Sequence, residues 1–233
     1  MVFKNKWYIL SAVLSLTVIF TAIMYANING WYSGGQKTAN GEVIARIDGK
    51  EITEKDFEMA LWVEEQKYEF QLKKYEREKQ HADENVLIPL PQRASPEQVL
   101  DRLIDNEVLY QEAKSQGLEV SYEEAKNYME QVRKTTNDIM EGEIQVADRE
   151  EFMESQKLIK QSIEKMGISE DEYWNRVVQA YQKSLAISRL KAKVLSSMPE
   201  EVRKDPEKVR LYFEQYAKDL RRKHKVEILK KDF

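Results

Sequence analysis

The chain of 233 residues contains no cysteine, and it has only eight glycines and five prolines. Without cysteine it can form neither disulfide bonds nor cysteine-ligated metal sites, and it cannot carry a lipid-modified cysteine as an anchor. Glycine and proline supply most tight turns, so their scarcity argues against a turn-rich β architecture. These absences favour a mainly helical protein.

The sequence also lacks the patterns of common catalytic and cofactor sites. It contains no phosphate-binding loop, nucleophile elbow or metal-ligand spacing. Its two histidines, His81 and His224, have no partner at helical spacing, and we interpret both as surface residues. Adjacent acids such as Glu64 and Glu65 point in different directions on a helix, which predicts a solvated face rather than acid–base catalysis. We therefore expect no enzymatic activity, no cofactor and no metal.

Basic residues are not in excess. The chain has 37 Lys and Arg against 41 Asp and Glu, and its formal net charge is −4. Nucleic-acid binding depends on neutralising phosphates with basic side chains. An acidic chain with a pI near 5.5 therefore argues against a nucleic-acid partner.

One long uncharged segment near the N-terminus predicts a membrane anchor. Residues Trp7–Ile28 are almost entirely apolar, and as a helix they would extend about 33 Å, enough to cross a hydrocarbon core of ~30 Å. Lys4 and Lys6 precede this segment, which places the N-terminus in the cytoplasm by the positive-inside tendency. The sequence thus predicts a cytoplasmic tail (1–6), a transmembrane helix (7–28), a flexible tether (29–41) and one extracytoplasmic domain at the cell membrane (42–233).

A cleaved signal peptide is the alternative interpretation of this segment. Its apolar core should span about 7–15 residues and end in a small-x-small site. Here the run is longer, and Met24-Tyr25-Ala26 puts a bulky residue where a small one is needed. Ser33-Gly34-Gly35 has suitable chemistry but lies far from the apolar core. We favour an uncleaved anchor.

The domain begins and ends with short strand patterns. Val43–Ile47 alternates apolar and polar residues and is followed by Asp48-Gly49, a tight-turn pair. Lys225–Leu229 alternates in the same way near the C-terminus. Because a lone strand cannot satisfy its backbone, we expect these two segments to pair. The predicted fold is therefore mainly α, with a small two-stranded clasp of the N- and C-terminal strands.

Five helices are predicted between these strands. Each starts with a capping residue and continues as an apolar stripe at helical spacing. The first is expected to fade into a charged stretch before Pro89, and the second to stop at Gly117. The predicted starts are Thr53-Glu54-Lys55-Asp56, Ser95-Pro96-Glu97-Gln98, Ser121-Tyr122-Glu123-Glu124, Ser169-Glu170-Asp171-Glu172 and Asp205-Pro206.

The order of these segments resembles the N-terminal chaperone domain of the SurA and PrsA families of exported foldases. The resemblance rests on four stretches: VIARIDGKEITEKDF (Val43–Phe57), LIDNEVLYQEAKSQGLEVSYEE (Leu103–Glu124), MGISEDEYWNRVVQAYQKSLAISRL (Met166–Leu190) and the ending LYFEQYAKDLRRKHKVEIL. Together they cover most of the domain in the order of the family. The resemblance implies a helical, SurA-N-like chaperone domain over residues 42–233.

The chain departs from the family pattern at one place. Many relatives carry a parvulin prolyl-isomerase module between the third and fourth stretches. Here the short interval between Leu190 and Tyr212 has no room for it, and no glycine follows Gly167. The glycine-rich run and paired histidines of parvulins are missing, so we interpret the isomerase module as absent.

Aromatic side chains are the candidates for client contact that the resemblance implies. They offer a large contact area with little demand on geometry, as promiscuous peptide binding requires. Ordinary helix packing is the alternative for each of them. Trp174 and Tyr181 are seven residues apart and share one helical face. The predicted client-binding residues are Trp62, Tyr68, Trp174, Tyr181 and Phe213.

The resemblance implies a membrane-anchored extracytoplasmic chaperone, a holdase for unfolded or exported polypeptides. Two alternatives stay open. One is a peptidyl-prolyl cis-trans isomerase, which family membership suggests and the missing module contradicts. The other is a structural or sensory ectodomain that docks one dedicated partner.

Overall fold

The computed structural model describes residues 42–81, 86–146 and 148–230. The predicted tail, membrane helix and tether (residues 1–41) lie outside the described residues, as does the side chain of His81. Within the described ranges, no helix combines the length and the apolar character that a membrane crossing requires.

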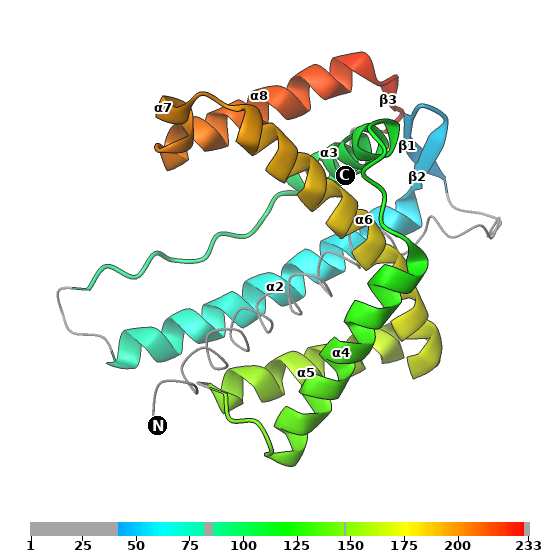
Figure 1. Cartoon of the computed structure of the whole chain (residues 1–233). Coiled ribbons are helices and arrows are strands. Elements are labelled where there is room, and N and C mark those ends of the chain that lie inside the picture. The colour runs from blue at the N-terminus through cyan, green and yellow to red at the C-terminus, as the bar shows by residue number, and fades with distance from the viewer. Residues whose placement is uncertain (1–41, 82–85, 147, 231–233) are drawn as a thin grey trace.

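A small antiparallel sheet joins the two ends of the domain (Figure 1). It consists of β1 (Val43–Ile47), β2 (Lys50–Thr53) and β3 (Val226–Ile228), in the order β2-β1-β3. β1 pairs with β3 in the register Ala45 to Ile228 and Ile47 to Val226. The predicted pairing of the terminal strands, which we call the terminal clasp, is confirmed.

The sheet has three strands rather than the predicted two. Asp48 and Gly49 both have positive φ, the conformation that a type I′ hairpin turn requires, and the chain returns along β1 as β2. The side chain of Ile52 in β2 is buried. The side chain of Glu51 is exposed and forms an ion pair with Arg46 at 3.2 Å. No element was predicted for residues 50–52, between the Asp48-Gly49 turn and the helix start at Thr53, and the second strand was therefore missed.

Seven helices fill the described part of the chain between β2 and β3. Their predicted caps are present: Thr53 and Asp56 exchange hydrogen bonds of 2.7 and 3.2 Å, and Ser95 forms a complete capping box with Gln98. Gly117 follows α3 with φ +68°, as expected of a glycine that ends a helix. The helices are α2 (Glu54–His81), α3 (Pro96–Ser115), α4 (Tyr122–Glu141), α5 (Arg149–Met166), α6 (Glu170–Ser197), α7 (Glu200–Arg203) and α8 (Pro206–Lys223).

Two of these helices and one helix end were not predicted. No helix start was predicted between Ser121 and Ser169, but α5 begins there, capped by Asp148, which accepts a hydrogen bond from the Glu151 amide. The single turn of α7 was also missed. α2 does not fade at the charged stretch and runs on to His81. Ion pairs with α5 lie along this distal half of α2.

Buried side chains form two hydrophobic cores. The first core joins the sheet, the start of α2, α3, the C-terminal half of α6 and α8. The second core joins α4, α5 and the N-terminal half of α6. Figure 1 shows α6 crossing the molecule from one group of helices to the other. The members of the second core are Val120, Ala125, Met129, Val132, Ile159, Tyr173, Val177, Val178, Ala180 and Tyr181.

Candidate functional site

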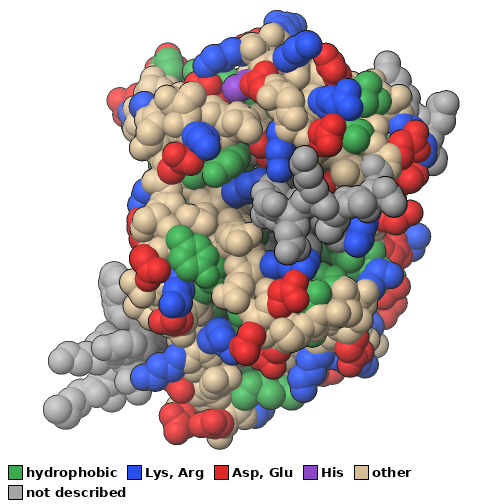
Figure 2. Space-filling view, turned by 90° about the vertical axis from the view of Figure 1, so that its right-hand side faces the viewer, with side chains coloured by type: hydrophobic (Ala, Val, Ile, Leu, Met, Phe, Trp, Pro, Cys, Tyr) green, Lys and Arg blue, Asp and Glu red, His purple; other side chains and the backbone are tan. Residues whose placement is uncertain are grey.

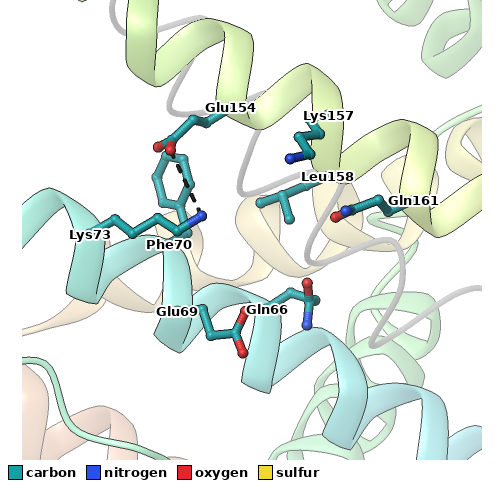
Figure 3. A pocket seen from close by; sticks show the side chains of 8 residues that line it. All are labelled: Gln66, Glu69, Phe70, Lys73, Glu154, Lys157, Leu158 and Gln161. Atoms are coloured by element: carbon teal, nitrogen blue, oxygen red, sulfur yellow. Dashed lines mark ion pairs between the residues drawn. The ribbon is translucent and has the colours of Figure 1, made fainter.

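A cleft lies between α2 and α5 (Figure 3). In Figure 1, α2 extends away from the sheet that forms the terminal clasp. Its volume is about 190 Å³. The two helices run antiparallel, because Lys73 on α2 pairs with Glu154 near the start of α5 while Trp62 lies against Lys165 near its end. The cleft is lined by Gln66, Glu69, Phe70, Lys73, Glu154, Lys157, Leu158 and Gln161.

The cleft has an apolar part and an amide-lined part. In Figure 3, Phe70 from α2 and Leu158 from α5 reach in from opposite helices, and Gln66 and Gln161 lie beside them. Phe70 is buried, Leu158 is half-buried, and Gln161 is exposed. Such a combination can hold an apolar group and hydrogen-bond a neighbouring polar one.

Ion pairs fasten the distal half of α2 to the first turns of α5. Lys74 Nζ lies 3.1 Å from Glu151, and Arg77 Nη1 lies 3.3 Å from Glu154. Lys73 Nζ lies 3.9 Å from Glu154, at the edge of the cleft. Partly exposed pairs of this kind contribute about 0–1 kcal/mol each. Their contribution to the stability of the fold is therefore small.

The two predicted aromatic residues on α2 lie on different sides of it. Trp62 is half-buried, and Lys165 of α5 lies 5.4 Å from its ring centroid, beyond the glutamine end of the cleft. The guanidinium of Arg93 lies over the ring of Tyr68, 4.8 Å from the ring centroid, where the segment before α3 runs back along α2. Of this pair, Trp62 is the one beside the cleft.

The other three predicted residues belong mainly to the packing of the domain. Tyr181 is buried in the second core and stacks on Tyr128 with ring centroids 4.7 Å apart. Trp174 is half-buried, and its Nε1 donates to Glu170 at 3.2 Å. Phe213 packs against the first core. The structure therefore does not gather the five residues into one surface, and Tyr181 has little surface left for a client.

The residues that form the cleft floor were missed. Phe70 is one of the domain's many aromatic residues and had no feature that set it apart. Leu158, Gln66 and Gln161 could be placed only once α5 was known as a helix packed on α2. The usable signal was Asp148 three residues before Glu151, a capping pattern, followed by Phe152 and Ile159 one helical face apart.

Ionisable groups away from the cleft form structural pairs. Lys183 and Glu107 lie 3.2 Å apart with side chains 11% and 10% exposed, and burial lowers the pKa of Lys183 against the opposing effect of Glu107. Burial also raises the pKa of Asp56, which accepts hydrogen bonds from the capping residue Thr53 at the start of α2. Among the residues that the structure describes, no group of three His, Asp or Glu side chains is arranged to hold a metal ion.

His224 is not the surface histidine that was predicted. Its side chain is only 9% exposed, and its Nδ1 lies 2.6 Å from Asp48 in the β1–β2 turn. Its Nε2 lies 3.7 Å from Glu112 of α3. His224 thus joins the end of α8 to the turn that starts the sheet, and the contact was invisible in sequence because Asp48 is far away along the chain.

The fold and the cleft define a helical domain closed by its own terminal strands, with a partly apolar cleft between α2 and α5. A family model described as the SurA-like N-terminal domain matches residues 3–153, well over half of the chain. The chain therefore belongs to the family of SurA-like N-terminal domains, which are of the chaperone type.

The family match has a definite extent. It starts before the predicted membrane helix and ends within α5, so it covers α2, α3 and α4. The resemblance noted in sequence for Met166–Leu190 and for the C-terminal ending lies beyond it. The chain has no significant match among curated proteins, and none among solved structures.

Proposed function

We propose that the chain is a membrane-anchored extracytoplasmic holdase that binds unfolded or exported polypeptides. The observation that carries this proposal is the match to the SurA-like N-terminal domain over residues 3–153, which places the chain in a chaperone-type family. Binding would be weak and reversible, because a site that accepts many sequences must order its side chains anew for each client.

Exposed apolar side chains on the described surface support this proposal. The extended segment before α3 carries Leu87, which is 98% exposed, and Val86 and Leu90, which are 58% and 63% exposed. Large apolar side chains that gather at the surface are typical of interaction sites. On the face in Figure 2, positive and negative side chains are interspersed with apolar patches, a pattern suited to polypeptides rather than to a polyanion.

The proposed location rests on the sequence. Trp7–Ile28 has the length and composition of a membrane helix, and Lys4 and Lys6 favour a cytoplasmic N-terminus. A tether of residues 29–41 would then hold the domain near the outer side of the membrane. This position suits clients that emerge from the membrane unfolded.

Two other functions compete with this proposal. A prolyl isomerase would agree with the wider foldase family, but the sequence has no parvulin module. An ectodomain for one dedicated partner would agree with the terminal clasp and the well-packed cores. It would bind one protein tightly and leave unrelated unfolded chains unaffected.

The decisive experiment measures aggregation and isomerisation in one preparation. The full chain is placed in phospholipid nanodiscs, with empty nanodiscs as the control. We expect it to slow aggregation of an unfolded model protein at modest molar excess, while cis/trans exchange at an X-Pro peptide keeps its uncatalysed timescale of tens of seconds or more. Accelerated exchange would support the isomerase instead. Unchanged aggregation would contradict the holdase and favour the dedicated partner.

A further inference from the structure

We propose that the α2–α5 cleft binds one large apolar side chain from an extended, uncharged polypeptide segment. The ligand class is thus a peptide with a leucine-like or phenylalanine-like residue among small polar neighbours. This inference rests on the proposed holdase function and gives it a location. It also predicts which segments of a client would be bound.

The size of the cleft fits a single side chain. Its volume is about 190 Å³, and an engineered protein cavity of ~150 Å³ lined by apolar side chains holds one benzene molecule. Phe70 and Leu158 supply apolar contact from the two helices. When an apolar side chain of the client moves from water into the cleft, the gain in free energy is roughly that of burying it in a protein core, provided that the contact is close. A whole helix would not fit in this space.

The glutamine amides fit the backbone on either side of that residue. An extended segment brings an N–H and a C=O for each residue, and burying them unpaired is costly. Each glutamine has one acceptor oxygen and two N–H donors. Gln66 on α2 and Gln161 on α5 lie next to the apolar part of the cleft, so both helices can hydrogen-bond a peptide whose side chain occupies it.

The charges around the cleft favour an uncharged segment. Lys73 and Lys157 are balanced by Glu69 and Glu154, and the first of these lysines is already paired with Glu154 at 3.9 Å. A charged ligand would meet one like charge for each opposite one and would lose hydration in addition. A neutral segment avoids both costs, so we commit to an uncharged client rather than to an acidic or basic one.

The test uses the full chain in nanodiscs and fluorescein-labelled peptides of the form Gly-Ser-Thr-X-Thr-Ser-Gly. With X as leucine or phenylalanine we expect saturable binding by fluorescence anisotropy, and with X as aspartate binding at least tenfold weaker. Leu158→Trp fills the cleft and should weaken binding of the leucine peptide at least fivefold. Met153→Trp adds the same ring at an exposed position of α5 outside the cleft and should leave binding unchanged.

A second variant keeps the test valid if Leu158→Trp fails to fold. Gln66→Ala together with Gln161→Ala removes both amides without adding bulk, and should weaken binding about three- to tenfold while the circular dichroism spectrum stays that of the wild type. Equal binding by wild type and Leu158→Trp, equal binding of the leucine and aspartate peptides, or no binding of the leucine peptide would each overturn the cleft assignment.

The aggregation assay separates this inference from the holdase function. If Leu158→Trp loses peptide binding and also loses suppression of aggregation, the cleft is the client site. If it suppresses aggregation like the wild type, the holdase function stands and the client role of the cleft is wrong. Dimers that are present in the wild type and absent in Leu158→Trp would show that the occupant is a second copy, and this too would overturn the assignment.

Discussion

The Lys183 ammonium lies 3.2 Å from the Glu107 carboxylate, at the point where α6 passes from the second hydrophobic core to the first. The ring of Tyr110 lies under the same ammonium, 4.9 Å away. On α6, Tyr181 belongs to one core and Ala186 to the other. A buried ion pair therefore marks the boundary between the two cores along the helix that connects them.

We predict that removing Lys183 alone is far more harmful than removing the pair. Lys183→Met leaves the Glu107 charge buried without its partner and should cost about 3–5 kcal/mol in the free energy of unfolding. Lys183→Met combined with Glu107→Met replaces both charges with apolar chains of similar volume, which should recover most of that loss. Urea unfolding of residues 42–233, followed by circular dichroism, measures both.

The matched control for the Lys183 and Glu107 variants is the exposed ion pair of Arg189 and Glu124, 2.7 Å apart. Removing either partner there should cost about 1 kcal/mol or less, because solvent screens the charges. If Lys183→Met were as mild as the change at Arg189, the ion pair would not be buried in the way that the structure describes.

A second prediction separates packing from client contact on α6. Tyr181→Ala removes a ring from the second core and should cost about 3–5 kcal/mol, whereas Trp174→Ala, at a half-buried position, should cost about 1 kcal/mol. Thermal unfolding of the two variants measures the difference. Equal losses would mean that Trp174 is part of the core as well. If Trp174→Ala shows the smaller loss, it is the variant suited to a test of client binding.

The sequence predicted the fold where its signals were local or ran along one element. Capping residues such as Thr53 and Ser95 and the glycine stop at Gly117 are short-range, and all three are found as predicted. The terminal clasp was predicted because an isolated strand at each end of the domain has one plausible partner. α5 was missed because few of its side chains are buried, so its apolar stripe is thin.

The candidate site could not be predicted for a related reason. Phe70 and Leu158 are far apart in sequence, and nothing in either local pattern pairs them. The buried position of Tyr181 likewise follows from its stacking on Tyr128 of another helix. Periodicity identified the apolar face of α6, but the helix that covers each part of that face is a tertiary property.

A third prediction concerns topology. If Trp7–Ile28 is an uncleaved anchor with a cytoplasmic N-terminus, the full-length chain should fractionate with membranes, and protease added to intact spheroplasts or protoplasts should digest the domain. A cytoplasmic marker protein, which should survive, is the control. A soluble product that begins near Gln36 would instead identify the segment as a cleaved signal peptide.

The last prediction concerns the acid stability of the terminal clasp. The Asp48 carboxylate is hydrogen-bonded to the His224 ring and accepts a hydrogen bond from the Lys225 backbone amide. These contacts lower the pKa of Asp48. Burial opposes ionisation of Glu112, but hydrogen bonds from Lys223 and Gln116 outweigh it, so the pKa of Glu112 is lowered as well. Both carboxylates bind protons more weakly in the folded chain than in the unfolded one.

A lowered pKa stabilises the folded chain above the pKa of the unfolded state, and this contribution is lost as pH falls through the lower, folded value. The ordinary values for these groups are 3.8 and 4.5, so the loss should begin near pH 4.5 and continue below it. Glu112→Gln should therefore be less stable than the wild type at pH 7, and the gap in urea midpoint should narrow as the pH falls below about 4.5. Glu78→Gln, at an exposed position of α2, is the control and should show no such convergence. A gap that stays constant with pH would mean that Glu112 acts through packing rather than through its charge.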